Sequence, residues 1–360
     1  MSLDLVEVLI PIPLMEKFSY LPPKNNSNLL KQGSRVLVPF GKRTLVGVVW
    51  SFSERDKSSN RKYKYIKEIL DEVPLLDSNS ISLAEWSSRY YHYPLGEIIS
   101  YFFPPSLRKG KEAKFRETKY LELTSKGSFL EEETLTRAPS QQKLISLLKD
   151  KKEMTLKSAQ AFGISNAAVN GLIEKGFVNR FSRELSPYKK LENKQLSSPK
   201  QLNPEQNKAV NAIKKAKDKN ITFLLDGITG SGKTEVYLQA IQEIVNEGKQ
   251  ALILIPEIGL APQAEERFRE YFGDRVMSFH SAKNEREKVD AWLGASRGLV
   301  DIIIGTRSSV FLPMKNLGII VVDEEHDLSF KQMEKFRYSA RDMALYLSLI
   351  HISEPTRRAI

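Results

Sequence analysis

Residues 227–234 have the spacing of glycine, lysine and hydroxyl side chains that binds the phosphates of a nucleotide. The run Gly-Ile-Thr-Gly-Ser-Gly-Lys-Thr matches the pattern G-x-x-x-x-G-K-S/T in full. In this pattern Lys233 reaches the β- and γ-phosphates, and the Thr234 hydroxyl binds Mg²⁺. Backbone N–H groups of the loop and of the helix that follows surround the phosphates. The other residues expected to contact the nucleotide are Gly227, Thr229, Gly230, Ser231 and Gly232.

A second set of chemically competent residues follows the apolar run 319–322. This run ends in Asp323-Glu324-Glu325-His326. Acidic residues after a strand are more often the first turn of a helix, where they favour the helix dipole. A strand that ends in carboxylates also places them at the sheet edge that carries a phosphate-binding loop. Because the loop is present, the catalytic interpretation is favoured. Asp323 would hold Mg²⁺, and Glu324 would orient and deprotonate an attacking water.

The elements that position both motifs alternate between apolar runs and helix-forming runs from residue 203 onward. The pattern Asn-Pro-Glu-Gln at 203–206 is typical of a helix N-terminus, with Asn203 as N-cap and Gln206 at the third position. Near-continuous apolar runs predict strands that helices cover on both faces, as in a parallel α/β sheet. The predicted strands are 223–225, 251–255, 301–304 and 318–322.

Two smaller regions precede this lobe. A β-rich region at 1–105 is predicted from strands at 5–10, 35–40 and 45–50 and a helix at 81–91. A second region at 106–190 begins with a basic linker. Its predicted helices at 141–149, 156–162 and 166–175 and its strand at 177–181 have the order of a winged helix-turn-helix. A three-helix packing domain that does not contact DNA is the alternative, and the basic chain favours DNA binding.

Composition narrows the class of protein. The 360 residues include 55 Lys and Arg against 44 Asp and Glu, a formal net charge of +11, which favours a polyanionic partner, nucleic acid before a membrane surface. No apolar run approaches the roughly 18 residues that a membrane-spanning helix requires. The first four residues carry no basic segment, so we expect no secretory signal and a cytoplasmic location. The absence of cysteine excludes disulfides and cysteine-ligated zinc in these residues.

Together, the phosphate-binding loop and the acidic motif resemble the first, RecA-like motor lobe of a superfamily 2 helicase. Segments 226–237, 255–263 and 304–313 are similar to the primosomal protein N′ family of replication-restart helicases. The N-terminal segments 18–20, 38–42 and 90–96 agree, so the resemblance covers nearly all of residues 1 to about 347. The lobe is then expected at 191–347. Residues 348–360 depart from the family pattern and are expected to be a non-native tail.

This resemblance implies an ATP-dependent 3′→5′ DNA helicase that recognises stalled or branched replication forks and initiates primosome assembly. ATP and Mg²⁺ are the implied cofactors, and the family's zinc ligands would lie outside this chain. Branched and single-stranded DNA, single-strand binding protein and other primosome proteins are the implied partners. The alternative is a branched-DNA and nucleotide-binding module without motor activity, because the family's second lobe supplies an arginine finger.

Individual positions for DNA also follow from the resemblance. The first domain would hold the 3′ end of a DNA strand at Phe18, Ser19, Gly41 and Lys64, and the family usually has an acidic residue where Ser19 stands. Gln206 would contact adenine. Three further positions, Glu257, Gln263 and Arg307, would track the DNA strand together with Thr306.

The segment 327–338 interleaves aromatic rings with cations, a composition that suits single-strand binding by stacking and phosphate neutralisation. It also resembles the family's aromatic-rich loop, which couples DNA contact to ATP hydrolysis. An amphipathic core helix is the alternative interpretation. The residues expected to contact DNA here are Phe330, Lys331, Phe336 and Arg337.

Overall fold

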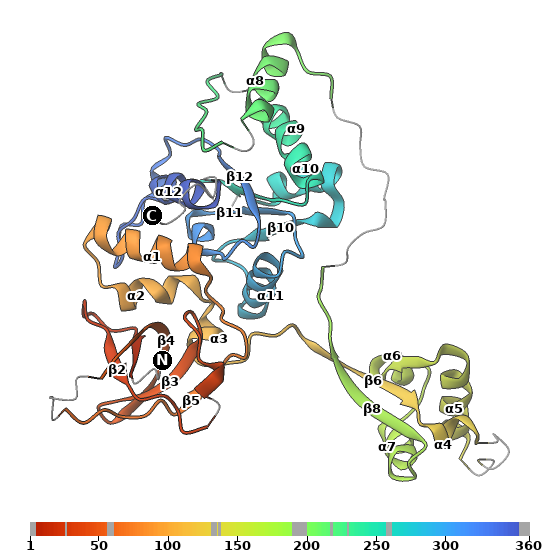
Figure 1. Ribbon diagram of the computed structural model, residues 1–360. Coiled ribbons are helices and arrows are strands. Elements are labelled where there is room, and N and C mark those ends of the chain that lie inside the picture. Colours follow the sequence, from red (N-terminus) through yellow and green to blue (C-terminus); the bar gives the residue numbers. More distant parts are fainter. Residues whose placement is uncertain are drawn as a thin grey trace. The chain divides into compact units, whose positions relative to one another are not determined.

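The computed structural model describes residues 5–25, 27–55, 61–130, 135, 138–188, 200–216, 219–228, 230–256 and 261–352 (Figure 1). The chain divides into two compact units, Met1–Ala113 with Tyr188–Ile360, and Lys114–Pro187. The first unit contains an antiparallel sheet and a parallel sheet, and the second contains a three-stranded antiparallel sheet. This confirms the predicted mixed α/β class. The boundaries of the functional domains stay a prediction. Within the described ranges, no helix has both the length and the apolar content to cross a membrane.

The N-terminal part is a five-stranded antiparallel sheet with the order β2-β1-β4-β3-β5. Backbone bonds from Leu21 N to Lys64 O, at 2.9 Å, and from Ile66 N to Leu21 O, at 3.0 Å, link the segments next to its two edge strands. The inward face buries alternate residues such as Val6, Val8, Val36 and Val38. The predicted strands are confirmed, and two short ones are added. The bounds are β1 Leu5–Leu9, β2 Phe18–Tyr20, β3 Arg35–Phe40, β4 Arg43–Ser53 and β5 Glu68–Ile69.

A buried ion pair holds this sheet to the helices that follow it. Arg35 on β3 is fully buried, and its Nη2 and Nε donate to the two carboxylate oxygens of Asp71 at 2.7 and 2.9 Å. Its Nη1 donates to the carbonyl of Leu107. Because five donors of one guanidinium form a planar fork, Arg35 can hold a carboxylate and a carbonyl from different segments at once. The helices here are α1 Ser78–Tyr91, α2 Leu95–Ile99 and α3 Pro105–Arg108.

The unit Lys114–Pro187 has the element order predicted for a winged helix-turn-helix. Its sheet has the order β7-β6-β8, and its helices bury Leu144, Leu148, Val169 and Leu172 in one core. Ser165 is the N-cap of the third long helix, where its Oγ accepts from Ala168 N at 3.2 Å. The bounds are β6 Glu117–Leu123, α4 Ser125–Ser128, α5 Pro139–Lys151, β7 Glu153–Thr155, α6 Leu156–Ala161, α7 Asn166–Glu174 and β8 Val178–Glu184.

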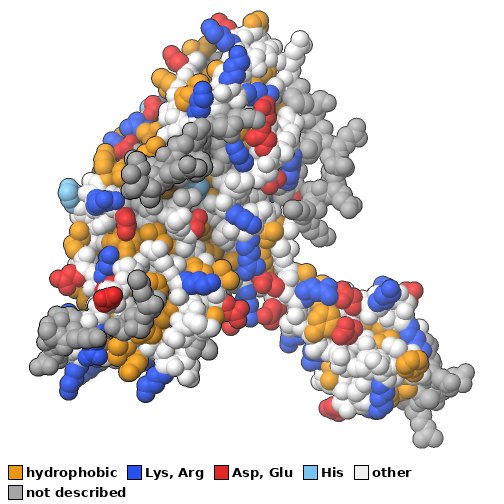
Figure 2. Space-filling view, in the orientation of Figure 1, with side chains coloured by type: hydrophobic (Ala, Val, Ile, Leu, Met, Phe, Trp, Pro, Cys, Tyr) orange, Lys and Arg blue, Asp and Glu red, His pale blue; other side chains and the backbone are white. Residues whose placement is uncertain are grey.

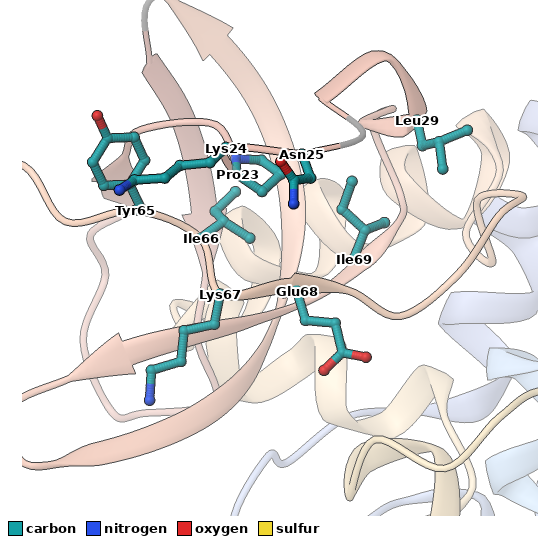
Figure 3. Close-up of a pocket in the computed structure, with 9 residues that line it drawn as sticks. All are labelled: Pro23, Lys24, Asn25, Leu29, Tyr65, Ile66, Lys67, Glu68 and Ile69. Carbon is teal, nitrogen blue, oxygen red and sulfur yellow. The ribbon is translucent and has the colours of Figure 1, made fainter.

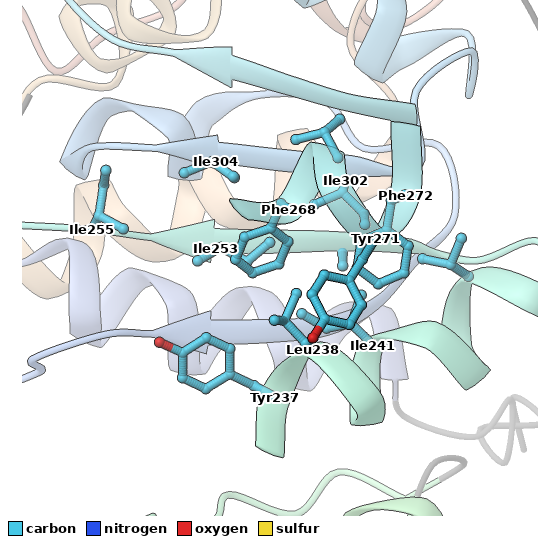
Figure 4. Packing of buried hydrophobic residues seen from close by; sticks show 13 residues of the cluster. Tyr237, Leu238, Ile241, Ile253, Ile255, Phe268, Tyr271, Phe272, Ile302 and Ile304 are labelled. Carbon is cyan, nitrogen blue, oxygen red and sulfur yellow. The ribbon is translucent and has the colours of Figure 1, made fainter. Parts of the chain in front are cut away.

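The lobe at the end of the chain is built on a parallel sheet with the order β10-β11-β9-β12. Figure 4 shows aromatic residues of α10 and aliphatic residues of α9 packed on one face of the strands, around Phe268, Leu238 and Ile253. The strands are β9 Gln250–Leu254, β10 Val276–Phe279, β11 Ile302–Gly305 and β12 Leu317–Val322. The helices are α8 Pro204–Lys215, α9 Lys233–Asn246, α10 Ala261–Phe272, α11 Glu285–Ser296 and α12 Ala340–Ile352.

One predicted strand of the lobe is absent. Residues 223–225 form no ladder, and Leu224 is 81 % exposed. A strand exists only when a neighbouring strand accepts its backbone hydrogen bonds. The described ladders give β12 only β9 as a partner, so hydrophobicity alone did not make this run a strand. The suspected tail is helical as far as residue 352, where α12 ends, and the rest of it lies outside the described residues.

The buried Arg35–Asp71 pair leads to a prediction about stability. Asp71→Ala leaves the guanidinium buried without its carboxylate, so the free energy of unfolding should fall by about 3–5 kcal/mol. Urea unfolding followed by tryptophan fluorescence measures this change. Arg269→Ala is the matched control, because it breaks an exposed pair with Glu265, worth about 0–1 kcal/mol. Equal effects of the two substitutions would contradict the structural role of Asp71.

Candidate nucleotide and DNA site

The phosphate-binding loop directly precedes helix α9. Gly230 and Gly232 have φ angles of 81° and 82°, in the left-handed region that favours glycine. Gly232 is the N-cap, so α9 begins at Lys233 and its free N–H groups lie at the loop. The Lys233 ammonium donates to the carbonyl of Gly227 at 2.7 Å, which spans the loop. The loop thus presents a helix N-terminus and a lysine at one place. Thr229 lies outside the described residues.

Gln206 ties helix α8 to this loop. The predicted capping arrangement is confirmed, since Gln206 N donates to Asn203 Oδ1 at 2.8 Å and Asn203 N donates to Gln206 Oε1 at 2.9 Å. The amide nitrogen of the Gln206 side chain, Nε2, donates to Ser231 O at 2.9 Å. A Cβ on Gly232 would lie 2.5 Å from that Nε2, so a side chain at this position would displace the contact. Adenine contact by Gln206 stays a prediction.

Tyr237 joins the phosphate-binding loop to the acidic motif. Its hydroxyl donates to Thr234 Oγ1 at 3.2 Å. Burial and the neighbouring Asp323 carboxylate raise the pKa of Tyr237. Asp323 follows β12, and its backbone N donates to Leu254 O at 2.9 Å. Burial raises the pKa of Asp323 above its usual value. The structure therefore brings Thr234 and Asp323 together. Tyr237 was missed in the sequence, although its position three residues after Thr234 places it on the same side of the helix.

Glu324 lies next to Asp323 in an unusual backbone conformation. Its φ is 48°, a left-handed value that costs energy for a residue with a Cβ. A turn closes behind it, because Asp327 N donates to Glu324 O at 2.9 Å. Its carboxylate is exposed, with His326 Nδ1 at 3.9 Å. The carboxylate is thus accessible to water at the end of β12, and its role in orienting a water stays a prediction.

A buried carboxylate fixes the first turn of α9. Glu235 is buried, and its two oxygens accept from the Tyr271 hydroxyl at 3.1 and 2.9 Å. Its Oε1 also accepts from Lys200 N at 3.2 Å, and Arg267 lies 3.6 Å from Oε2. A buried charge is tolerated only with such partners. Glu235 therefore ties α9, whose N-terminus follows the glycine-rich loop, to α10.

The positions predicted to track DNA in the lobe lie on different elements. Arg307 Nη1 donates to the carbonyl of Ser329 at 3.2 Å, so its guanidinium holds the loop after the acidic motif. Thr306 is buried as the N-cap of a short 3₁₀ helix. Gln263 is exposed on α10, and Glu257 lies outside the described residues. Contact of Arg307 or Gln263 with DNA stays a prediction.

The rings of the aromatic-rich loop are buried in the protein. Phe330 and Phe336 are 2 % and 0 % exposed, so neither ring is open to a DNA base in this structure, and their contact with DNA stays a prediction. The reason for the burial of Phe336 lies far away in the sequence, because its ring packs 5.2–5.6 Å from those of Tyr91, Tyr93 and Tyr101. The alternative of an amphipathic helix is wrong, since only Leu328–Phe330 is helical. The predicted cations, Lys331 and Arg337, are exposed.

Further contacts join the N-terminal part to the lobe along the same seam. Trp86 of α1 stacks on Tyr346 of α12, with ring centroids 4.5 Å apart and an interplanar angle of 8°. Ser339 N donates to the Tyr91 hydroxyl at 3.1 Å, and burial raises the pKa of Tyr91 to about 12. Trp292 Nε1 donates to Phe102 O at 2.7 Å. The loop after the acidic motif is therefore held by residues of the N-terminal part.

The residues predicted to hold a DNA 3′ end gather around β2. Phe18 faces the inner side and meets Phe40 edge-on at 5.2 Å, beside Gly41, whose φ is 57°. Ser19 faces the outer side, since successive side chains of a strand alternate. Lys64 is exposed, and its carbonyl accepts from the backbone next to β2. Glu7 stands opposite Ser19 in the ladder, a neighbouring carboxylate that the sequence analysis did not identify.

Burial of Phe336 predicts a structural role for this ring. Phe336→Ala should lower the free energy of unfolding by about 3–5 kcal/mol, because it leaves a cavity between the two parts. Met333→Ala in the same loop is the control, since Met333 is 71 % exposed and should change stability little. Urea unfolding of both variants provides the measurement. Wild-type stability of Phe336→Ala combined with a loss of single-stranded DNA binding would favour direct stacking instead.

Comparisons with known proteins agree with this geometry. A model of the 3′ DNA-binding domain matches residues 7–104, and a model of the DEAD/DEAH box helicase matches residues 203–358. The replication restart protein PriA of Haemophilus influenzae is 35 % identical over 353 residues, which cover 96 % of this chain and 47 % of that protein.

Replication restart protein PriA of Bacillus subtilis is 30 % identical over 397 residues, covering 91 % of this chain and 49 % of that protein. The one from Chlamydia trachomatis is 34 % identical over 350 residues, covering 94 % and 46 %. The chain spans about half the length of the curated relatives it matches. Over nearly all of its length the chain is therefore similar to PriA replication restart proteins, and it contains matches to the 3′ DNA-binding domain and to the DEAD/DEAH box helicase domain.

Proposed function

We propose that this chain is the fork-recognition and ATP-binding part of an ATP-dependent 3′→5′ DNA helicase that initiates primosome assembly at stalled or branched forks. The observation that carries the proposal is the position of Tyr237, whose hydroxyl donates to Thr234 and lies beside the Asp323 carboxylate. This arrangement puts the hydroxyl of the phosphate-binding loop beside the carboxylate of the acidic motif. The names of the relatives and the helicase model support the same function.

Each residue of the site has a distinct task in binding and hydrolysis. Lys233 neutralises the β- and γ-phosphates, and the N-terminus of α9 donates backbone N–H groups to them. The hydroxyl of Thr234 and the carboxylate of Asp323 are oxygen donors of the kind that Mg²⁺ takes, so these two residues would hold the ion. When bound, Mg²⁺ neutralises charge on the phosphates. Glu324 orients a water and accepts its proton.

The described residues suggest no zinc site. Among them, no three His, Cys, Asp or Glu side chains gather in a way that would hold a metal ion. The chain contains no cysteine, and cysteine is a frequent ligand of structural zinc. Zinc binding by family residues outside this chain stays a prediction.

Recognition of the fork is assigned to the first two regions of the chain. The sheet of residues 1–105 would hold the 3′ end of a strand, and the winged helix-turn-helix of residues 106–190 would bind duplex DNA. Single-strand binding protein and other primosome proteins would be the protein partners.

A second candidate function is binding of nucleotide and branched DNA without motor action. It is favoured because Lys233, Thr234, Asp323 and Glu324 all lie on one lobe, whereas the resemblance places the arginine finger on a second lobe. Stabilisation of the transition state by an arginine finger contributes roughly 10³–10⁵ in rate.

Lys233→Ala tests the proposed nucleotide site. Loss of one ammonium from the phosphates should lower the affinity for a fluorescent ATP analogue with Mg²⁺ by about tenfold or more. Fork affinity should stay within about twofold, because fork recognition is assigned to residues 1–190. Lys288→Ala is the matched control, since both ammonium groups donate to a backbone carbonyl at 2.7 Å. Parallel loss of nucleotide and fork binding by Lys233→Ala would contradict the division of tasks.

Because Ser19 stands where the family usually has an acidic residue, we expect only modest discrimination between a 3′-OH and a 3′-phosphate. A neutral hydroxyl accepts a weaker hydrogen bond than a carboxylate, so a fork with a 3′-OH should bind about 2- to 10-fold more tightly than one with a 3′-phosphate. Ser19→Ala should remove that preference, whereas Ser78→Ala at the exposed start of α1 should keep it. The measurement is a fluorescence titration of both forks at one salt concentration. Equal binding of the two ends by the wild-type chain would show that Ser19 does not read the terminus.

A further inference from the structure

The segment 61–67 has a composition that the proposed function uses only in part. Its sequence, Arg-Lys-Tyr-Lys-Tyr-Ile-Lys, contains four cations, two tyrosines and no acidic residue. Lys64 is the only one of these residues given a role above. A run of cations is often just a solvated surface, so composition alone does not indicate a site. The geometry around Tyr65 does.

The backbone of this segment is held in place, which sets the direction of its side chains. Ile66 N donates to Leu21 O at 3.0 Å, and Lys67 N donates to Leu37 O at 2.8 Å. Ile66 is buried, with 2 % of its surface exposed, whereas Tyr65 is 48 % exposed. The hydrophobic core accounts for Ile66. It does not account for a large aromatic ring that remains half in water.

A cavity of about 460 Å³ lies between this segment and the loop after β2. Figure 3 shows the apolar side chains of Ile66 and Ile69 between the two segments, with Tyr65 and Lys24 together at one end. The Lys24 ammonium lies 5.5 Å from the centre of the Tyr65 ring. Glu68 also lines the cavity and is its one carboxylate, beside Lys67, whose ammonium donates to Thr44 Oγ1 at 2.6 Å.

This combination matches the two chemical parts of a nucleotide. An aromatic ring and an apolar floor can pack against the flat face of a base, and a nearby ammonium can donate hydrogen bonds to a phosphate. Volumes of several hundred Å³ are typical of pockets for molecules of this size. An acidic protein segment could pair with the cations, but it would leave the exposed ring and the apolar cavity without a partner. A nucleotide would fill both. Figure 2 shows Lys and Arg side chains next to hydrophobic ones on the visible face of the N-terminal part.

We propose that the cavity at Tyr65 and Lys24 binds one internal nucleotide of a single DNA strand whose 3′ end is held at Ser19. The base lies against Tyr65 and the apolar floor, and its phosphate lies at Lys24. The placement follows from the chain, because Tyr65 adjoins Lys64, and Leu21, two residues after Ser19, pairs with this segment. The inference rests on the proposed binding of DNA by residues 1–105. It adds a site that requires no terminus.

Single-strand binding by the whole chain tests the site. The probe is a 5′-fluorescein-labelled decamer of thymidylate with a 3′-OH, titrated by anisotropy at several salt concentrations. Tyr65→Ala should weaken binding about fivefold or more, whereas Tyr65→Phe should restore it, because stacking needs the ring and not the hydroxyl. Lys24→Gln should lower the slope of log affinity against log salt by about one. Lys31→Gln, an exposed lysine of the same domain outside the cavity, serves as the control.

The outcomes separate this inference from the function on which it rests. Tyr65→Ala should leave the preference for a 3′-OH over a 3′-phosphate unchanged, since the terminus is held elsewhere. Wild-type affinity of both Tyr65→Ala and Lys24→Gln for the decamer would overturn the cavity site and leave DNA binding intact. A wild-type chain that does not bind the decamer would overturn both. Unaltered urea unfolding midpoints, expected for exposed side chains, would show that the variants are folded.

Discussion

Burial of the Phe336 ring is the contact on which the arrangement of the first unit depends. The ring comes from the loop after the acidic motif and is surrounded by tyrosines of the N-terminal part. Edge-on aromatic pairs are worth about 0.5–1.5 kcal/mol beyond the area they bury, and Phe336 makes two of them, with Tyr91 and Tyr101. Because the Phe336 ring is buried among side chains of the N-terminal part, this contact holds the loop after the acidic motif to the N-terminal part.

Polar contacts hold both ends of the same loop, one from the lobe and one from the N-terminal part. Arg307 holds its start through the carbonyl of Ser329, and Tyr91 holds its end through Ser339. Asp323 and Glu324 stand immediately before it, at the end of β12. A continuous set of contacts therefore runs from the carboxylates that would serve ATP hydrolysis to the domain that would bind the DNA terminus. Such continuity is the physical route by which one site can bias the other, and coupling itself is a matter of measured free energies.

Helix α9 combines several tasks within its first two turns. Its N-terminus and Lys233 lie at the glycine-rich loop, Tyr237 bonds to Thr234 beside the acidic motif, and Glu235 bonds to α10. These directions differ because successive residues of a helix point about 100° apart. The buried carboxylate of Glu235 is costly without partners, and Tyr271 and the backbone of Lys200 supply them. The phosphate-binding loop is therefore supported from two sides, by α8 through Gln206 and by α10 through Glu235.

The sequence by itself determined the features that depend on neighbouring residues. The glycines of the phosphate-binding loop, the capping box of Asn203 and Gln206, and most strands could be predicted, because local spacing sets backbone conformation and burial. Tertiary structure decided the rest. Residues 223–225 are apolar enough for a strand but have no ladder partner. Phe336 lies in a segment whose composition suits DNA stacking, but tyrosines some 240 positions earlier in the chain bury its ring. The hydrogen bond between Tyr91 and Ser339 joins residues 248 positions apart in the same region. Which partner a side chain meets depends on the folded path of the whole chain, and no local pattern contains that information.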